Sequence, residues 1–292
     1  MPWSRILSTI VASPLALGAI WLGGWYYTLG FAILVYLAHR EYLNLVRAKG
    51  IIPAGKTSLF LTICLVCCAN INPQFADALL PLAGTFICFY LLFKPKMATI
   101  ADLAASILGL FYIGYLPSFW VRLRSLGRSL TLNDSVFPFP ETWQLGADGV
   151  RHLSEGLTLT LIAFGCIVAA DIGAYVFGRC FGRTPLSDIS PKKTVEGAIF
   201  GIASSVAVAT AGGWYIHWPA WPETGVALGL LIGIASLLGD LTESLMKRDA
   251  GVKDSGQLIP GHGGILDRAD SYVFTAPIVY YFATLVLPLL RG

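Results

Sequence analysis

Apolar residues fill long stretches of this chain, and short segments rich in Gly, Pro and charged residues separate them. About 20 apolar residues are enough for an α-helix to cross the hydrocarbon core of a bilayer. The pattern therefore predicts nine membrane-spanning helices, although the run at 57–71 is short for a full crossing. The first run resembles a secretory signal, but no small-residue cleavage site follows it, which favours a retained helix. The predicted spans are residues 5–22, 26–46, 57–71, 76–93, 99–120, 157–180, 197–216, 224–246 and 271–289.

The composition supports a membrane protein. Hydrophobic residues make up 55% of the 292 residues and charged residues only 13%, whereas a soluble domain carries roughly 25% charged residues. A chain this poor in charge cannot cover a surface that faces water, and its apolar side chains must face lipid. Secreted disulfide scaffolds, disordered tails and nucleic-acid-binding modules are excluded, and the net charge of +3 is too small to require a polyanionic partner. We expect an all-α, polytopic integral membrane protein without a nucleic-acid partner.

The basic residues predict the orientation of the chain. With nine spans, fifteen of the 20 Lys and Arg residues fall on the side that holds the N-terminus. Loops rich in Lys and Arg stay in the cytoplasm, which places that side, with the loops 181–196 and 247–270, in the cytoplasm. The predicted location is the cell (inner) membrane, crossed several times.

The chain divides into two halves of different character. Residues 1–120 form an N-terminal transmembrane half of about five spans, in which Asp102 is the exception to a near absence of internal ionisable groups. Residues 121–156 form a connecting loop on the non-cytoplasmic side. Residues 157–292 form a C-terminal half of about four spans, and its two cytoplasmic loops carry the candidate chemistry.

The segment from Gly239 to Asp270 has the densest group of ionisable residues. Asp240, Glu243, Ser244 and Lys247 follow at i, i+3, i+4 and i+7, which places them on one stripe of a helix. Ionisable groups at the membrane boundary are costly, and they mark functional sites by default. The alternative is a carboxylate–Lys pair that only locks two helices together.

A glycine-rich segment follows, Pro260-Gly261-His262-Gly263-Gly264. Glycines at this density let backbone N–H groups approach an anion closely. Asp267 and Asp270 come next, three residues apart, so both carboxylates share a face if the segment is helical. Carboxylates beside Lys and Arg suit a phosphate chain bridged to Mg²⁺. A lone His such as His262 is more often structural than chemical.

The other predicted cytoplasmic loop repeats this combination. Asp171 lies inside the sixth span, and Tyr175 follows one turn later. The spacing of Gly178 and Gly182 favours close helix packing over ligand contact. The run from Ser190 to Gly197 places hydroxyls and lysines at the start of a helix, where free N–H groups and the helix dipole favour phosphate. The alternative reading of the lysine pair is a topology signal or a contact with anionic lipid.

These residues match two motifs of a known family. The run Ser244-x-x-Lys247-Arg248-x4-Lys253-Asp254-x8-His262-Gly263-Gly264-x-x-Asp267-Arg268-x-Asp270 resembles the signature of the phosphatidate cytidylyltransferases, or CDP-diacylglycerol synthases. The segments Asp171-x-x-Ala174-Tyr175-x-x-Gly178 and Ser190-Pro191-x-Lys193-Thr194-x-Glu196-Gly197 resemble the family's other motif. The motifs cover roughly the C-terminal 120 residues.

The resemblance implies a Mg²⁺-dependent membrane enzyme that converts CTP and phosphatidate to CDP-diacylglycerol and pyrophosphate, with one or two metal ions. Expected metal ligands are Asp240, Asp267 and Asp270, and weaker candidates are Asp171, Glu196 and Glu243. Expected catalytic residues are Asp240, Lys247, Arg248, His262, Asp267, Arg268 and Asp270. Expected substrate-binding residues are Asp171, Tyr175, Ser190, Lys193, Thr194, Glu196, Ser244, Lys253, Gly263 and Gly264. Lys193, Lys247, Arg248, Lys253 and Arg268 would hold phosphates of CTP or of phosphatidate.

Two alternatives differ in the chemistry they predict. A CTP-dependent lipid-alcohol kinase of the polyprenol or phytol kinase type would transfer the γ-phosphate and release CDP. A cation-coupled transporter would use buried carboxylates to bind ions, but transporters commonly show internal repeats and helix breaks at the membrane midplane. Here the charged residues gather on one side of one half of the chain instead. Membrane lipids are expected partners, and the sequence leaves a homodimer open.

Overall fold

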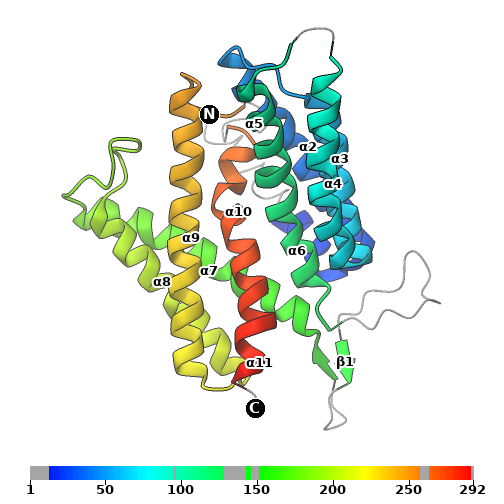
Figure 1. Cartoon of the computed structure of the whole chain (residues 1–292). Helices are drawn as coiled ribbons and strands as arrows, with labels where there is room; N and C mark the ends of the chain where they lie inside the picture. The colour runs from blue at the N-terminus through cyan, green and yellow to red at the C-terminus, as the bar shows by residue number, and fades with distance from the viewer. Residues whose placement is uncertain (1–12, 95–96, 128–142, 146–150, 257–262, 291–292) are drawn as a thin grey trace. The chain divides into compact units, whose positions relative to one another are not determined.

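The computed structural model describes residues 13–94, 97–127, 143–145, 151–256 and 263–290. Within the described residues, each of the nine predicted segments contains helix, which confirms the all-α fold class (Figure 1). The helices are Ser13–Leu22, α2 (Gly24–Ala48), α3 (Gly55–Ile71), α4 (Pro73–Leu92), α5 (Ile100–Gly109), α6 (Leu116–Arg124), α7 (Glu155–Phe181), α8 (Val195–Tyr215), α9 (Trp221–Asp249), α10 (Leu266–Tyr281) and α11 (Leu287–Leu289). The π-helical turns η1 (Leu110–Tyr115) and η2 (Phe282–Val286) join α5 to α6 and α10 to α11.

Six of the helical segments described are long and apolar enough to cross a membrane. They are Pro73–Leu92, Ile100–Arg124, Glu155–Phe181, Val195–Tyr215, Trp221–Asp249 and Leu266–Leu289. Ser13–Leu22 and Gly55–Ile71 are apolar but shorter, and α2 is not among the six. The structure therefore supports a protein with several membrane spans, and the other predicted crossings stay predictions.

The connecting loop contains two short strands, β1 (Trp143–Leu145) and β2 (Arg151–Leu153). They pair antiparallel, with Gln144 opposite His152. The predicted connecting loop thus contains a short hairpin.

The chain folds into two compact units that interleave along the sequence. The first unit is Met1–Thr158 with Met246–Ala269, and the second is Leu159–Leu245 with Asp270–Gly292. These units do not coincide with the contiguous halves 1–120 and 157–292, because the end of α9 and the segment after it belong with the N-terminal helices.

In the first unit, α3 lies against α2, α4, η1 and α6. A buried polar network joins two of these helices. The His39 ring of α2 contacts the Ser58 hydroxyl of α3 at 3.0 Å and the Thr62 hydroxyl at 3.3 Å. The Tyr42 hydroxyl donates to the Ala105 carbonyl at 2.7 Å. Buried polar groups need such partners, since an unmade hydrogen bond costs about 1–3 kcal/mol.

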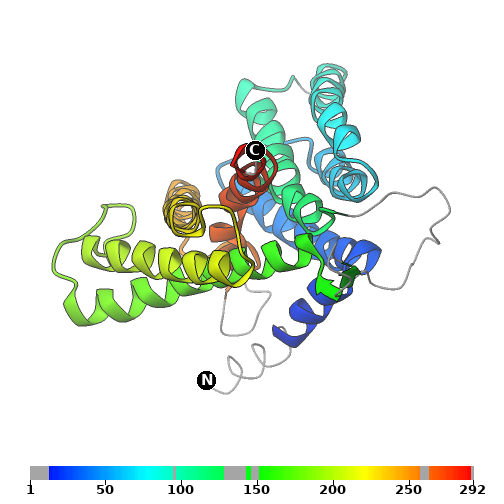
Figure 2. The ribbon, with the colours of Figure 1, turned by 90° about the horizontal axis from the view of Figure 1, so that it is seen from below.

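In the second unit, small residues bring the helix backbones together. Gly225, Gly229 and Gly233 recur every four residues on α9, and a Cβ at any of them would crowd the backbone of α8. Small residues at this spacing are typical of helices that pack closely in membranes. On α7, Gly178 faces Gly197 of α8, so its predicted packing role is confirmed. Figures 1 and 2 show α7 and α8 side by side.

Candidate active site

The loop between α7 and α8 folds back on the start of α8. The Leu186 N–H donates to the Lys193 carbonyl at 2.8 Å, and the Val195 N–H donates to the Thr184 carbonyl at 2.9 Å. Thr194 is the N-cap of α8, and its hydroxyl oxygen accepts the Gly197 N–H at 3.2 Å. Side-chain oxygens at this position satisfy N–H groups that the first turn of a helix leaves without a partner. The cap and the loop contacts fix the backbone of Lys193 beside the helix.

Glu196 stabilises the same loop from the first turn of α8. Its carboxylate accepts the N–H groups of Arg183 at 3.1 Å and of Thr184 at 3.2 Å, and also the Thr184 hydroxyl at 3.1 Å. These donors lie at the start of the loop, thirteen and twelve residues before Glu196. The structure therefore gives Glu196 a loop-organising role, whereas the sequence made it a weaker metal candidate.

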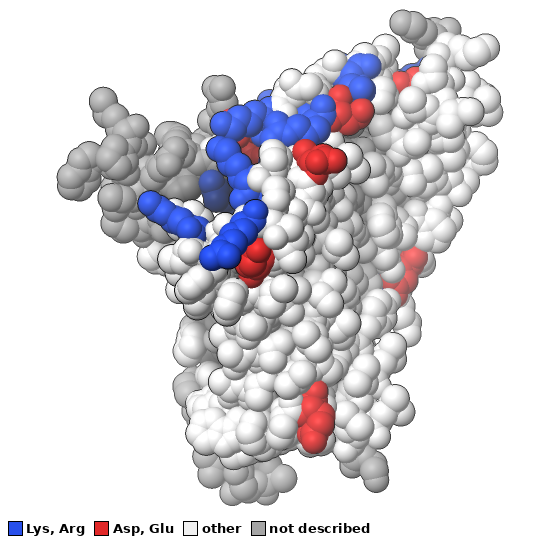
Figure 3. Space-filling view, turned by 90° about the vertical axis from the view of Figure 1, so that its left-hand side faces the viewer, with Lys and Arg blue, Asp and Glu red and all other residues white. Residues whose placement is uncertain are grey.

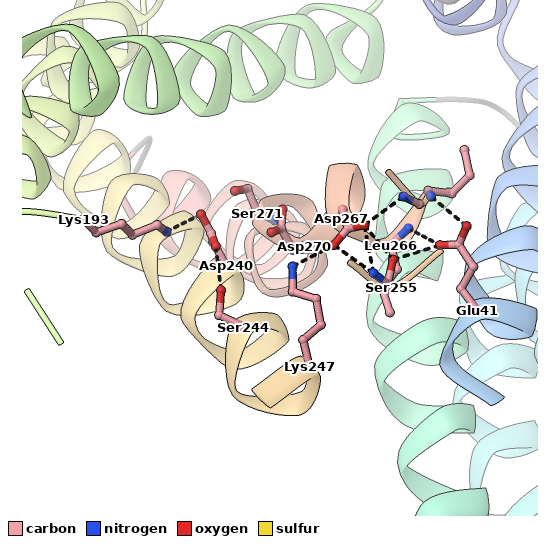
Figure 4. Close-up of polar contacts among 12 residues, drawn as sticks. Glu41, Lys193, Asp240, Ser244, Lys247, Ser255, Leu266, Asp267, Asp270 and Ser271 are labelled. Atoms are coloured by element: carbon pink, nitrogen blue, oxygen red, sulfur yellow. Dashed lines mark hydrogen bonds and ion pairs between the residues drawn. The ribbon is translucent and has the colours of Figure 1, made fainter. Parts of the chain in front are cut away.

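Lys193 points from this loop to α9, where its ammonium pairs with the Asp240 carboxylate (Figure 4). The Ser244 hydroxyl, one turn further along α9, donates to the other Asp240 oxygen at 3.4 Å. The two ion-paired side chains are 27% and 30% exposed, so water and ligands can reach them.

Asp270 on α10 lies in the same unit and is buried. Its carboxylate accepts the Ser271 N–H at 2.7 Å and interacts electrostatically with Asp240, Asp171 and Lys193. Gly239 makes this placement possible, because a Cβ there would collide with the Asp270 carbonyl oxygen. The predicted residues Asp240 and Asp270 are therefore brought together by the close approach of α9 and α10.

Asp267 is the centre of a second polar group, which lies in the first unit. Its carboxylate pairs with the Lys247 ammonium at 2.7 Å, and the two side chains are 10% and 14% exposed. It also accepts the Gly264 N–H at 2.8 Å and both the N–H and the hydroxyl of Ser255 at 3.0 Å. Four donors surround this carboxylate, which is the arrangement expected for a buried charge.

The predicted glycines contact these carboxylates with their backbone. Gly263 has a φ of +85°, a conformation that glycine adopts without strain. A Cβ at Gly264 would collide with the Ser255 hydroxyl and with the carboxylate of Glu41. Both positions require glycine because acidic side chains of the protein approach their backbone closely: Asp267 at Gly263 and Glu41 at Gly264.

Glu41 on α2 joins the polar group around Asp267, and no motif in the sequence pointed to it. It is buried, and its carboxylate accepts the N–H groups of Ile265 at 3.0 Å and Leu266 at 2.9 Å, and the Ser255 hydroxyl at 3.1 Å (Figure 4). A signal was present in the sequence, because an acidic residue inside the predicted span 26–46 is costly and marks a functional position. Asp102 is therefore not the single exception among the first five predicted spans, because Glu41 is a second internal acidic residue.

Other predicted residues lie apart from these contacts. Tyr175 is 66% exposed on α7, where its hydroxyl accepts from the Arg179 guanidinium at 3.3 Å. Arg248, Lys253 and Arg268 are exposed, and Ser190 is half-buried in the loop before α8. His262 lies outside the described residues. On the face drawn in Figure 3, Lys and Arg side chains gather towards one end, and uncharged side chains cover most of the remaining surface.

The carboxylates of the candidate site differ in how well they suit a metal ion. No three His, Cys, Asp or Glu side chains are grouped to hold a metal within the part of the chain that the structure describes. Mg²⁺ usually takes only one or two protein carboxylates and completes its shell with water and substrate phosphates. Asp240 and Asp270, two interacting carboxylates within one unit, have the donor chemistry for such a site.

The chain is similar to several known proteins. The sequence profile of the cytidylyltransferase family matches residues 3–286. The chain is 58% identical over 299 aligned positions to the phosphatidate cytidylyltransferase of Synechocystis sp., and the alignment covers all of both chains. It is 44% identical to the chloroplastic phosphatidate cytidylyltransferase 4 of Arabidopsis thaliana, over 89% of this chain and 68% of that one. It is 31% identical to the phosphatidate cytidylyltransferase of Staphylococcus aureus, over 94% of this chain and 96% of that one.

Proposed function

Because the chain belongs to the cytidylyltransferase family, we propose that it converts CTP and phosphatidate to CDP-diacylglycerol and pyrophosphate. The observation that carries the proposal is the 58% identity, over the whole length, to a protein named phosphatidate cytidylyltransferase. The two motifs of the C-terminal half lie within this match. Neither alternative, the lipid-alcohol kinase or the transporter, is favoured by the relatives.

The reaction joins two anions. A phosphate oxygen of phosphatidate attacks the α-phosphorus of CTP and forms the new P–O bond. The bond from the α-phosphorus to the oxygen that bridges to the β-phosphorus breaks, and pyrophosphate leaves with that oxygen. The nucleophile is already ionised and needs no strong base. Rate enhancement therefore depends on holding the substrates in line and on neutralising charge at the phosphorus and on the leaving group.

We assign charge neutralisation to the basic residues of the two polar groups. Lys193 and Lys247 each contact a carboxylate in the structure, and each ammonium can turn from that carboxylate to a phosphate oxygen. Lys carries three rotatable donors on a flexible stem, which suits this exchange. The exposed cations would complete the phosphate contacts: Arg248, Lys253 and Arg268.

We propose that Asp240 and Asp270 hold Mg²⁺, as one or two ions, with Asp267 as a further ligand. When bound, Mg²⁺ would supply Lewis-acid neutralisation of the triphosphate oxygens. Asp267 lies one turn before Asp270 on α10, but it would have to give up some of its four present donors. We assign Asp171 an outer role in this group, because it interacts electrostatically with Asp270.

We further propose nine membrane crossings, with the loops 181–196 and 247–270 in the cytoplasm of a cell (inner) membrane. The excess of Lys and Arg on one side of the chain supports this orientation. A site at the cytoplasmic boundary would meet CTP from water and the phosphatidate head group from the leaflet. Membrane lipids would surround the chain, and a homodimer is compatible with the proposal.

The proposal can be tested with two radiolabelled forms of CTP. Purified protein is incubated with Mg²⁺ and phosphatidate, and with CTP labelled at either the α- or the γ-phosphate. A cytidylyltransferase moves the α-label into the lipid and releases the γ-label in pyrophosphate. A lipid-alcohol kinase, given a polyprenol or phytol, moves the γ-label into the lipid and leaves the α-label in CDP. Lipid labelled only from γ-labelled CTP would overturn the proposed function.

A further inference from the structure

Glu41 connects α2 to a segment more than two hundred residues away in the sequence. Its carboxylate accepts three hydrogen bonds, from Ser255, Ile265 and Leu266, and all four residues belong to the first unit. Glu41 is only 7% exposed. A buried carboxylate is tolerated when hydrogen bonds satisfy it, and here two of the three donors are backbone N–H groups.

These backbone donors lie at the start of α10. The helix begins at Leu266, and the first N–H groups of a helix have no acceptor within the helix. A negative charge at a helix N-terminus is favoured by the helix dipole. Glu41 thus acts as a cap supplied by another helix, and it fixes where α10 begins. Asp267 is the second residue of α10, so its direction depends on that anchor.

Ser255 links Glu41 to Asp267 directly. Its hydroxyl lies 3.1 Å from a Glu41 oxygen and 3.0 Å from an Asp267 oxygen. A hydroxyl has one proton, so Ser255 shares it between the two carboxylates. When Asp267 turns to a ligand, Ser255 can donate to Glu41 and stay in place. The close contact of Gly264 with both Glu41 and Ser255 shows how little space separates these groups.

We infer that Glu41 is a positioning residue for the reaction: it fixes Ser255 and the first turn of α10, and so sets the orientation of Asp267. This inference rests on the proposed function, since Asp267 is assigned to the site there. Glu41 itself touches no substrate in this assignment and acts through the loop that it holds. The N-terminal helices would therefore contribute to catalysis through one buried carboxylate.

The test compares three variants: Glu41→Gln, Ser255→Ala and the control Asp102→Asn. Asp102 is also a buried carboxylate of the first unit that accepts two backbone N–H groups, from Ile52 and Thr99, but it contacts no residue of the 255–267 segment in the hydrogen bonds described. In Glu41→Gln, an NH₂ group replaces one carboxylate oxygen and faces a backbone N–H, so that N–H loses its acceptor. Ser255→Ala removes the bridging hydroxyl and leaves the backbone contacts of Glu41, so it stays informative if Glu41→Gln folds poorly.

We expect Glu41→Gln to lower kcat per folded enzyme by about 10- to 100-fold, the effect of misplacing a catalytic group by about 1 Å. Ser255→Ala should lower it less. The KM for phosphatidate should change by less than about twofold, since the basic residues are untouched. Hydrogen–deuterium exchange in a peptide covering residues 263–270 should quicken at least about tenfold in Glu41→Gln, because two amides lose their acceptor. Asp102→Asn should leave both measurements near wild type.

Wild-type kcat in Glu41→Gln and Ser255→Ala, or unchanged exchange of the 263–270 peptide in Glu41→Gln, would overturn the inference. Equal losses of kcat in Asp102→Asn and Glu41→Gln would also overturn it, because the effect would then be general destabilisation. Failure of the proposed function would look different: the wild-type protein would make no CDP-diacylglycerol. The exchange measurement does not depend on activity and tests the anchor in either case.

Discussion

The Lys193 ammonium, in the loop before α8, pairs with the Asp240 carboxylate on α9. Each group thereby has an intramolecular partner of opposite charge. A phosphate and a divalent cation together could replace both partners at once, the phosphate on the lysine and the cation on the aspartate. Under the proposed function, Lys193 would then bind the phosphate and Asp240 the metal ion.

Lys193→Met should lower activity per folded enzyme by about 100-fold, because one charge-neutralising contact at a reacting phosphate is worth about that much. Stability should change by less than about 1 kcal/mol, since the pair is partly exposed. The matched control is Lys49→Met, which breaks the exposed Lys49–Asp249 pair of 3.0 Å. Initial rates and thermal unfolding in detergent provide the comparison. If Lys193→Met retains more than half of the wild-type rate, the phosphate role of this lysine is wrong.

Asp240, Asp267 and Asp270 should behave as one metal-binding unit. Replacing any one of them by Asn keeps the volume but removes a charge, so half-saturation should require more Mg²⁺ and turnover should collapse. Groups that act together are not additive, and the double variant Asp240→Asn/Asp270→Asn should be scarcely slower than the slower single variant. The measurement is activity per folded enzyme across a Mg²⁺ titration.

Asp267 also has a structural role to separate from the metal role. It contacts Lys247, Ser255 and Gly264 in the structure. A merely structural Asp267 would give an Asp267→Asn enzyme with reduced thermal stability but near-normal turnover and unchanged Mg²⁺ dependence. That outcome would restrict the metal site to Asp240 and Asp270.

Gly239→Ala should disturb the contact between Asp240 and Asp270, because Gly239 directly precedes Asp240 and lies against Asp270. Alanine is favoured over glycine inside a helix by about 1 kcal/mol, but here the methyl group meets the Asp270 carbonyl oxygen. We expect a net destabilisation of about 1–3 kcal/mol, as is typical of overpacking, and a large loss of activity. Gly84→Ala on α4 is the control, because a Cβ there has no atom within 4 Å. Equal thermal stability of the two variants would contradict the close approach.

The two loops should be reached from the cytoplasmic side. Single cysteines introduced at Asp188 and Asp254, both exposed, should react with a membrane-impermeant maleimide only when the cytoplasmic side is accessible. A cysteine at Glu223, in the first turn of α9, should react from the opposite side. The experiment uses sealed vesicles of both orientations and a background without the six native cysteines. Labelling of all three positions from one side would refute the proposed topology.

The sequence determined the helices well, for a local reason. Burial in lipid depends on how many apolar residues follow one another, so the apolar runs marked all nine helical segments. The number of membrane crossings did not follow directly from the number of apolar runs. Gly55–Ile71 is short, and α2 contains Arg40 and Glu41 in its polar C-terminal part, so six segments meet the criteria of length and apolarity.

The sequence also determined which residue types gather in the candidate site, because the signature places carboxylates, cations and glycines at fixed spacing in the last two long helices and the loops before them. Only the tertiary structure decided how each carboxylate is used. Asp240 faces a lysine, Glu196 holds its own loop, and Asp267 is surrounded by donors. Glu41 became part of the site only when α2 packed against the start of α10. A carboxylate binds whichever donors the fold brings within about 3 Å, and helix packing sets that distance between residues far apart in the sequence.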